Sequence, residues 1–317
     1  MNKVKIGVVG VGYLGQHHVR IFSEIPKVEI VGIADLNLQR AKEIASIYNI
    51  PFVTSDYRDL LDRVDAVSIV TPTNTHFQIA KDFLLRGIHT FIEKPVTQTL
   101  KEAETLLEIA SGKNLILQVG HIERFNPAVQ ELKRYINDPF YMEIKRSGPF
   151  DGRITDVGVV MDLMIHDLDI LFYVLGKGRK ILDIKGYGYS FYTSYEDFAN
   201  VELVFEGNLL VNLIASRVTP KKIRRLDIYE KNGDLISIDY MEQSISIIHG
   251  NRKQVETSIE TPVLEKEEPL RLELEHFVNC ILEGSDPEVT LEDGKLALAL
   301  ATEILKELRI FDIKKDT

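Results

Sequence analysis

The first fifteen residues constrain the fold more than any other stretch of the chain. A short β-branched run, residues 3–9, leads into Gly10, Gly12 and Gly15 with Tyr13 and Leu14 between them, and the residues that follow suit a helix. In such a strand–turn–helix the first glycine permits the tight turn, the second lets a pyrophosphate approach the backbone, and the third lets the helix pack against the strand. Free N–H groups at the start of the helix would face the phosphates. The stretch predicts a dinucleotide-binding turn formed by these residues, and the alternative is a glycine-rich turn without a ligand.

Asp35 indicates which dinucleotide is bound. A second apolar run, residues 28–34, ends at this carboxylate, near the offset of about 20 residues expected for a ribose-binding acid. A carboxylate accepts hydrogen bonds from the 2′-hydroxyl of the adenosine ribose and repels a 2′-phosphate, so the sequence predicts NAD as the cofactor. Arg40, one helical turn into the next predicted helix, is the side chain that could reach a phosphate instead.

Length and charge narrow the class of protein. A chain of 317 residues suits two domains of ordinary size. The formal charge of -10 disfavours nucleic acid as a partner, because phosphate binding needs a cationic surface. The one cysteine, Cys280, cannot form an internal disulfide, which favours a cytoplasmic location. We expect no membrane association, since no window approaches the roughly 20 apolar residues of a membrane span.

Two loops follow predicted parallel strands in the first part of the chain. The runs 64–71 and 87–92 are nearly continuous in apolar residues, as in strands covered on both faces. Ligands of doubly wound sheets bind beyond the carboxyl ends of the strands, so both loops should line the cofactor. The residues predicted to do so are Thr71, Pro72, Asn74, His76, Glu93 and Lys94. For the first loop the alternative is that Asn74 caps a helix at 77–86. A strand at 114–120 would complete an N-terminal α/β Rossmann domain, residues 1–120, with a doubly wound parallel sheet.

Residues 121–317 have a different pattern. Long runs with strand character, several joined by tight turns, predict a C-terminal α+β domain with a large, open, mostly antiparallel sheet. Helices at 269–282 and 293–308 should close the chain. The apolar rows Leu203/Phe205 and Leu209/Val211/Leu213 exceed what one helical layer would cover, which predicts a homodimer or homotetramer formed through this domain.

The predicted helix 158–175 carries candidate catalytic side chains. At 100° per residue Asp162, His166, Asp169 and Tyr173 share one arc, and apolar residues occupy the other side. A carboxylate one turn from an imidazole can orient the ring, and histidine titrates nearest neutral pH, so the pair suits proton transfer. Periodicity alone does not separate this from a solvated helix face. Asp167 falls on the apolar side, which the pattern does not explain.

Together these motifs resemble the Gfo/Idh/MocA oxidoreductases. The glycine-rich start, the loop 71–76, Glu93-Lys94-Pro95 and the Asp162/His166 pair occur in that family's order. The resemblance implies a Rossmann domain coupled to an open-sheet domain, and an NAD-dependent dehydrogenase acting on a sugar hydroxyl. It implies proton transfer by Lys94 and His166 with support from Asp162, and the sequence does not choose between Lys94 and His166 as the base.

A narrower resemblance concerns the substrate. The stretches 119–127, 162–169 and 215–218 are similar to family members that oxidise UDP-N-acetylglucosamine to its 3-keto derivative. A diphosphate bound to an acidic protein also needs arginines. The predicted substrate-binding residues are His121, Arg124, Asn126, Arg153, Asp169 and Arg217. The alternatives are a dehydrogenase of another sugar or polyol and a non-catalytic NAD-binding sensor. A metal enzyme is disfavoured, since one cysteine and one Asp/His pair fall short of three ligands.

Overall fold

The computed structural model describes residues 3–152, 157–250 and 258–313. The chain forms two compact units: unit 1 comprises Met1–Ile122 and Glu268–Lys295, and unit 2 comprises Glu123–Glu267 and Leu296–Thr317. The sequence placed one boundary at residue 120 and assigned everything after it to the second domain. In the structure the segment from Glu268 to Lys295 instead belongs to unit 1.

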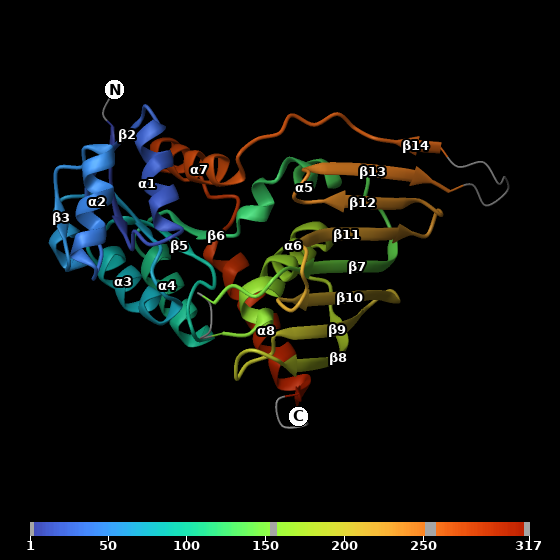
Figure 1. Ribbon diagram of the computed structural model, residues 1–317. Coiled ribbons are helices and arrows are strands. Elements are labelled where there is room, and N and C mark those ends of the chain that lie inside the picture. The colour runs from blue at the N-terminus through green and yellow to red at the C-terminus, as the bar shows by residue number, and fades with distance from the viewer. Residues whose placement is uncertain (1–2, 153–156, 251–257, 314–317) are drawn as a thin grey trace. The chain divides into compact units, whose positions relative to one another are not determined.

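Unit 1 is built on a six-stranded parallel sheet (Figure 1). Its strand order, β3-β2-β1-β4-β5-β6, is the doubly wound arrangement and confirms the predicted Rossmann domain. The strands are β1 (Val4–Val9), β2 (Val28–Ala34), β3 (Val53–Thr54), β4 (Ala66–Ile69), β5 (His89–Glu93) and β6 (Leu117–Gly120). The helices are α1 (Gly15–Glu24), α2 (Leu38–Tyr48), α3 (Thr73–Leu85), α4 (Leu100–Ser111) and α7 (Pro269–Glu283), and α8 (Leu291–Glu307) begins in this unit.

Local signals explain where these helices begin. Asn37 caps α2 by accepting a hydrogen bond from the N–H of Arg40, as its sequence position predicts. Thr99 and Glu102 form a reciprocal capping box at α4. The alternative role considered for Asn74, as the cap of a helix at 77–86, is wrong, because α3 already begins at Thr73 and Asn74 lies in its first turn.

Helix α7 belongs to unit 1 because its apolar face packs into that unit's core. Leu274 and Phe277 are fully buried, and the ring of Phe277 lies 5.8 Å from the ring of Phe91 on β5. Figure 1 shows α7 beside α1, and Arg271 of α7 forms an ion pair with Glu24 of α1. Sequence order suggested the second domain, but the complementary apolar surface lies in the first.

Unit 2 contains a nine-stranded sheet ordered β14-β13-β12-β11-β7-β10-β9-β8-β15 (Figure 1). It is antiparallel except where β7 pairs with β10 and β8 with β15, which confirms the predicted mostly antiparallel sheet. The strands are β7 (Pro139–Ser147), β8 (Ile181–Ser190), β9 (Phe198–Phe205), β10 (Leu209–Ser216), β11 (Ile223–Glu230), β12 (Leu235–Asp239), β13 (Ser244–His249), β14 (Ser258–Glu260) and β15 (Leu308–Asp312).

Three of these strands, β13, β14 and β15, were not predicted. Strand β13 shows only two buried isoleucines in alternation, and β15 follows α8 without an intervening turn signal. The remaining helices of unit 2 are α5 (Pro127–Leu132) and α6 (Ile165–Leu175). None of the helices in the described part of the chain is both long enough and apolar enough to span a membrane.

The two faces of the large sheet differ in burial. The rows expected to be left over, Leu203/Phe205 and Leu209/Val211/Leu213, are at most 2% exposed and belong to the core of unit 2. That argument for an oligomer is therefore wrong. A different row runs across the opposite face of the sheet, where Tyr229, Tyr141, Leu210 and Val204 are paired from strand to strand and remain partly exposed.

Candidate functional site

The glycine turn in unit 1 has the geometry that the spacing predicts. A side chain on Gly15 would place its Cβ 1.9 Å from the carbonyl oxygen of Gly10, so α1 packs against the turn only with glycine there. Gly10 has φ +87 and lies against the backbone of Val70. Gly12 has open space where its Cβ would be, which leaves room for a ligand to approach the backbone. Tyr13 and Leu14 are exposed on the same turn.

Asp35 connects this turn to the end of β2. One carboxylate oxygen accepts a hydrogen bond from the N–H of Val11 at 2.8 Å, and the other accepts one from the N–H of Asn37 at 2.8 Å. Its carboxylate is thereby fixed at the wall of a cavity of about 660 Å³. Gly10, Gly12, Thr71, Pro72 and Asn74 line the same cavity, so the structure brings these predicted cofactor residues together.

The sequence missed Tyr57 and Arg58, which also line this cavity. The hydroxyl of Tyr57 donates to Asp82 at 2.7 Å, and burial together with this carboxylate raises the pKa of Tyr57 to about 12. The guanidinium of Arg58 lies 4.8 Å from the centre of the Tyr57 ring. The short helix that carries both residues follows β3, and no glycine or charge pattern marked it.

His76 and Arg40, also predicted at the cofactor, are not among the residues that line this cavity, and both bond to other groups of unit 1. His76 is 1% exposed, with Nε2 2.8 Å from the carbonyl oxygen of Thr71 and Nδ1 2.9 Å from that of Pro95. It therefore holds the two cofactor loops together, and its burial lowers its pKa. Arg40 donates to Gln16 at 2.7 Å, near the start of α1.

Lys94 is positioned by a buried polar chain beneath its turn. The N–H of Lys94 donates to the carboxylate of Glu93 at 3.3 Å, and Glu93 lies 3.2 Å from Nε2 of His18. His18 is fully buried, and its Nδ1 lies 2.9 Å from the hydroxyl of Ser68. Glu93 is 8% exposed and packs against Gly120, where a Cβ would lie 2.9 Å from the carboxyl group. Glu93 therefore fixes the backbone of the turn that carries Lys94.

The candidate catalytic helix of unit 2 begins with a π-helical segment, Val160–Met164, before α6. The N–H of Ile165 bonds to the carbonyl of Val160, five residues earlier, so the assumed period of 3.6 residues fails across Asp162. Asp162 and His166 are both half-buried. Such segments occur frequently at functional sites.

Two predicted substrate residues, Arg124 and Asp169, form a buried ion pair. The guanidinium of Arg124 binds both oxygens of Asp169, with Nε at 2.8 Å, and the two residues are 3% and 1% exposed. Asn126 is 1% exposed, caps α5 and donates to the carbonyl of Tyr240 at 2.9 Å. In the structure all three contribute to the packing of unit 2.

Asp167, which periodicity did not explain, pairs with a buried arginine. Arg146 of β7 donates to Asp167 at 2.8 Å and to Glu123 at 2.7 Å, and all three are at most 6% exposed. Burial would lower the pKa of Arg146, but the two carboxylates raise it. The only sequence signal was a basic residue on the buried face of a strand.

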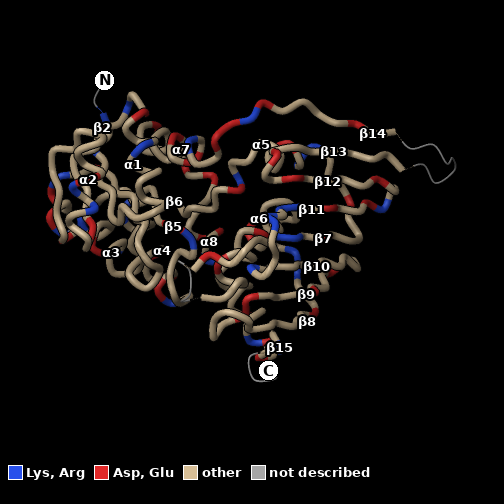
Figure 2. The backbone as a smooth tube through the Cα atoms, viewed as in Figure 1, with Lys and Arg blue, Asp and Glu red and all other residues tan. Residues whose placement is uncertain are grey.

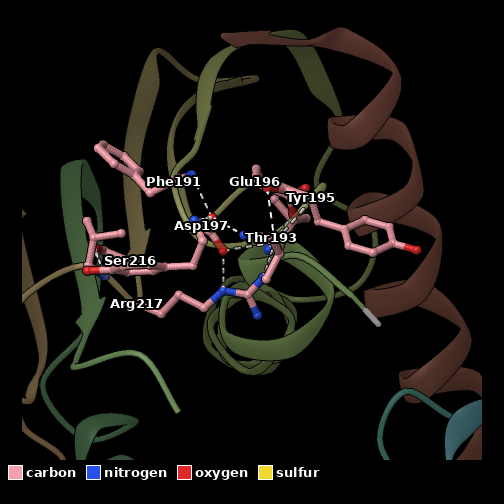
Figure 3. A network of polar contacts seen from close by, with 10 residues as sticks. Phe191, Thr193, Tyr195, Glu196, Asp197, Ser216 and Arg217 are labelled. Atoms are coloured by element: carbon pink, nitrogen blue, oxygen red, sulfur yellow. Dashed lines mark hydrogen bonds and ion pairs between the residues drawn. The ribbon is translucent and has the colours of Figure 1, made fainter. Parts of the chain in front are cut away.

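Arg217, also predicted to contact substrate, is 5% exposed and lies in the network of Figure 3. Its Nε donates to Asp197 at 2.6 Å, and a second nitrogen donates to the hydroxyl of Thr193 at 2.9 Å. Asp197 also accepts three backbone N–H bonds, from residues 191–193. Glu196 accepts from the N–H of Val160 and so connects this loop to the π-helical segment.

Two predicted substrate residues remain. His121 is 1% exposed at the end of unit 1. Arg153 lies outside the residues that the structure describes.

Comparison with known proteins places both units in one family. Residues 4–121 match the family described as "Oxidoreductase family, NAD-binding Rossmann fold". Residues 139–236 match the "GFO/IDH/MocA C-terminal domain".

Individual relatives extend over nearly the whole chain. A UDP-N-acetylglucosamine 3-dehydrogenase from Acidithiobacillus ferrooxidans is 34% identical over 98% of this chain and 99% of its own. A solved structure of that enzyme has a TM-score of 0.90, with coverage of 97% of this chain and 98% of that chain. A scyllo-inositol 2-dehydrogenase (NAD(+)) from Bacillus subtilis is 28% identical over 94% of this chain and 92% of its own.

Replacing Asp35 should weaken NAD binding more than NADP binding. Asp35→Asn removes the charge that favours ribose hydroxyls and repels a 2′-phosphate, so we expect a loss of about 10-fold or more in NAD affinity. Calorimetric titration with both dinucleotides measures this. Asp62→Asn, an exposed carboxylate paired with Arg86, is the matched control. A wild-type preference for NADP would contradict the role given to Asp35.

Asp197 should stabilise the protein in a pH-dependent way. Burial alone would raise the pKa of Asp197, but the three backbone N–H groups and Arg217 hold it at about 2. A depressed pKa gives stability that is present above the ordinary value near 4 and is lost as pH falls through about 2. We expect Asp197→Asn to lower the free energy of unfolding by about 2 kcal/mol at pH 7, and by less towards pH 3.

Urea denaturation across this pH range is the measurement. Asp183→Asn, an exposed carboxylate beside Lys185, is the matched control and should leave the free energy of unfolding nearly unchanged, because surface ion pairs contribute little. An Asp197→Asn difference that stays constant with pH would show that its charge is not the cause.

Proposed function

Because the chain belongs to the Gfo/Idh/MocA oxidoreductase family, we propose that it is an NAD-dependent dehydrogenase that oxidises the 3-hydroxyl of UDP-N-acetylglucosamine to a ketone. The substrate assignment rests on the 34% identity to a UDP-N-acetylglucosamine 3-dehydrogenase over nearly the full length of both chains. The second candidate is a polyol dehydrogenase, favoured by the inositol dehydrogenase relative at 28% identity. The buried Cys280 is compatible with the cytoplasmic location that we propose.

The residues of unit 1 fit a bound dinucleotide. Gly12 leaves open space beside the cavity, and Asp35 presents a fixed carboxylate at its wall. NAD, when bound, supplies the carbon that accepts hydride from the sugar. The chain contributes the glycine turn and α1 for the diphosphate, Asp35 for the ribose, and the Thr71–Asn74 loop along the cavity.

The hydroxyl proton passes to either Lys94 or His166. Lys94 is half-buried, and the Glu93–His18 pair fixes the backbone from which its side chain extends. Asp162 lies in the π-helical segment that precedes His166 and is proposed to orient the imidazole. In this proposal the buried ion pairs of Arg124 with Asp169 and of Arg217 with Asp197 fix the packing of unit 2, which binds the substrate.

Lys94→Met and His166→Asn should each lower turnover by roughly 10²- to 10⁴-fold and leave NAD affinity nearly unchanged, because general acid–base catalysis contributes about this much. If the two residues act as one unit, the double variant should be little slower than the slower single variant. Steady-state kinetics with UDP-N-acetylglucosamine and NAD measure both effects. Lys101→Met, at an exposed position, and His249→Asn, at a partly exposed position on β13, are matched controls.

The same assay distinguishes the two candidate substrates. Wild-type protein should form NADH from UDP-N-acetylglucosamine and little from scyllo- or myo-inositol. NADH from an inositol alone would move the assignment to the polyol dehydrogenase. Absence of NADH with every substrate, despite tight NAD binding, would leave the non-catalytic sensor.

We also propose that the protein forms a homodimer or homotetramer through the exposed face of the large sheet. The row Tyr229–Tyr141–Leu210–Val204 is apolar across four strands, and the rings of Tyr141 and Tyr229 lie 5.5 Å apart. A twofold interface brings the same face of two copies together, so it would cover this row in both copies.

Leu210→Arg should dissociate this oligomer, because it buries a charge at the centre of the row. Sedimentation equilibrium at micromolar concentration should show a dimer or tetramer for wild type and a smaller species for the variant. Leu282→Arg, on an exposed position of α7, should leave the assembly unchanged. A wild-type protein that sediments as a monomer would refute the proposal.

A further inference from the structure

Arg224 differs from three buried arginines of unit 2, Arg124, Arg146 and Arg217. It lies near the start of β11, directly opposite Arg146 on β7, and 40% of its side chain is exposed. Arg124, Arg146 and Arg217 are at most 5% exposed, and each donates close hydrogen bonds to a carboxylate. Arg224 contacts Glu123 at a longer distance, 3.7 Å.

The surroundings of Arg224 leave its charge incompletely balanced. Glu123 is shared, because its Oε1 accepts from Arg146 at 2.7 Å and lies 3.7 Å from Arg224, so Arg224 has the weaker contact with this carboxylate. Burial and the repulsion of Arg146 lower the pKa of Arg224, while Glu123, Asp167 and Asp162 act in the opposite direction. An added anion at this guanidinium would offset the repulsion between the two arginines.

Arg224 lies on the same face of the sheet as Arg146, its partner in register, and Arg146 bonds there to Asp167 of α6. Asp162, in the π-helical segment before His166, is one of the carboxylates whose charge acts on Arg224. The next residue, Arg225, points to the opposite face, where it pairs with Asp227 and is 55% exposed. Figure 2 shows basic residues on β7 and β11, the two strands that meet here.

We propose that Arg224 binds the diphosphate of a nucleotide-sugar substrate, a role that rests on the proposed function. An accessible guanidinium can donate two parallel hydrogen bonds to phosphate oxygens, and its planar fork matches them better than an ammonium group does. Arg124 and Arg217 are already committed to buried carboxylates, whereas Arg224 has an exposed surface that a ligand can reach.

Calorimetric titration with UDP and with uridine tests this directly, since the two probes differ only in the diphosphate. We expect Arg224→Gln to weaken UDP binding by about 10- to 100-fold and to leave the weaker uridine binding unchanged. Arg224→Lys should bind UDP with intermediate affinity. Arg225→Gln is the matched control and should bind both probes like wild type.

The substitution should not unfold the protein, because Glu123 keeps its hydrogen bond from Arg146. Thermal melting of each variant checks this. Equal UDP affinity in wild type and Arg224→Gln would overturn the proposal, as would a parallel loss of uridine binding or a wild type that does not bind UDP.

Kinetics separate this inference from the proposed activity. If UDP binds through Arg224 but no NADH forms from UDP-N-acetylglucosamine, the activity fails and the diphosphate site stands. If NADH forms and Arg224→Gln leaves the KM unchanged, the diphosphate site fails alone.

Discussion

The close contact between Gly10 and Gly15 determines how the cofactor-binding turn of unit 1 is built. Gly15 approaches the carbonyl of Gly10 so closely that a Cβ would lie 1.9 Å from it, and this closeness lets α1 begin directly above β1. Asp35 then bonds to the N–H of Val11 inside the same turn. The position of the carboxylate at the cavity wall therefore depends on the glycine turn, and any larger residue at Gly15 would disturb both.

In unit 2, buried ion pairs determine the positions of the helix and loops. Removing an arginine or a carboxylate from water costs several kcal/mol unless it is paired and hydrogen-bonded. Each of Arg124, Arg146 and Arg217 meets a carboxylate within the unit, so these groups fix how the helix and loops lie on the sheet. Glu196 extends this support to the π-helical segment through the N–H of Val160. The candidate catalytic helix is thus held by polar contacts as well as by its apolar face.

The two units divide the proposed chemistry. Unit 1 provides the glycine turn, Asp35 and the turn of Lys94. The carboxylate of Glu93 bonds to the backbone of this turn and contacts the buried His18. Unit 2 provides Asp162, His166 and, in our proposal, an arginine for the diphosphate. Glu93 holds the backbone N–H of Lys94, and Glu196 holds the N–H of Val160 at the start of the π-helical segment, so both segments start from fixed backbone positions, as proton transfer between positioned groups requires.

The sequence by itself determined the Rossmann unit, the antiparallel sheet, the glycine turn and Asp35, because these follow from local spacing and from alternation within a strand. It did not determine how the arginines are paired, since their partners lie far along the chain, 45 residues for Arg124 and 20 for Arg217. Nor could it place α7, whose apolar face fits the core of unit 1. Tertiary structure alone decided that Asp167 is paired and that Arg224 remains accessible, because burial and charge balance depend on which strands and helices meet.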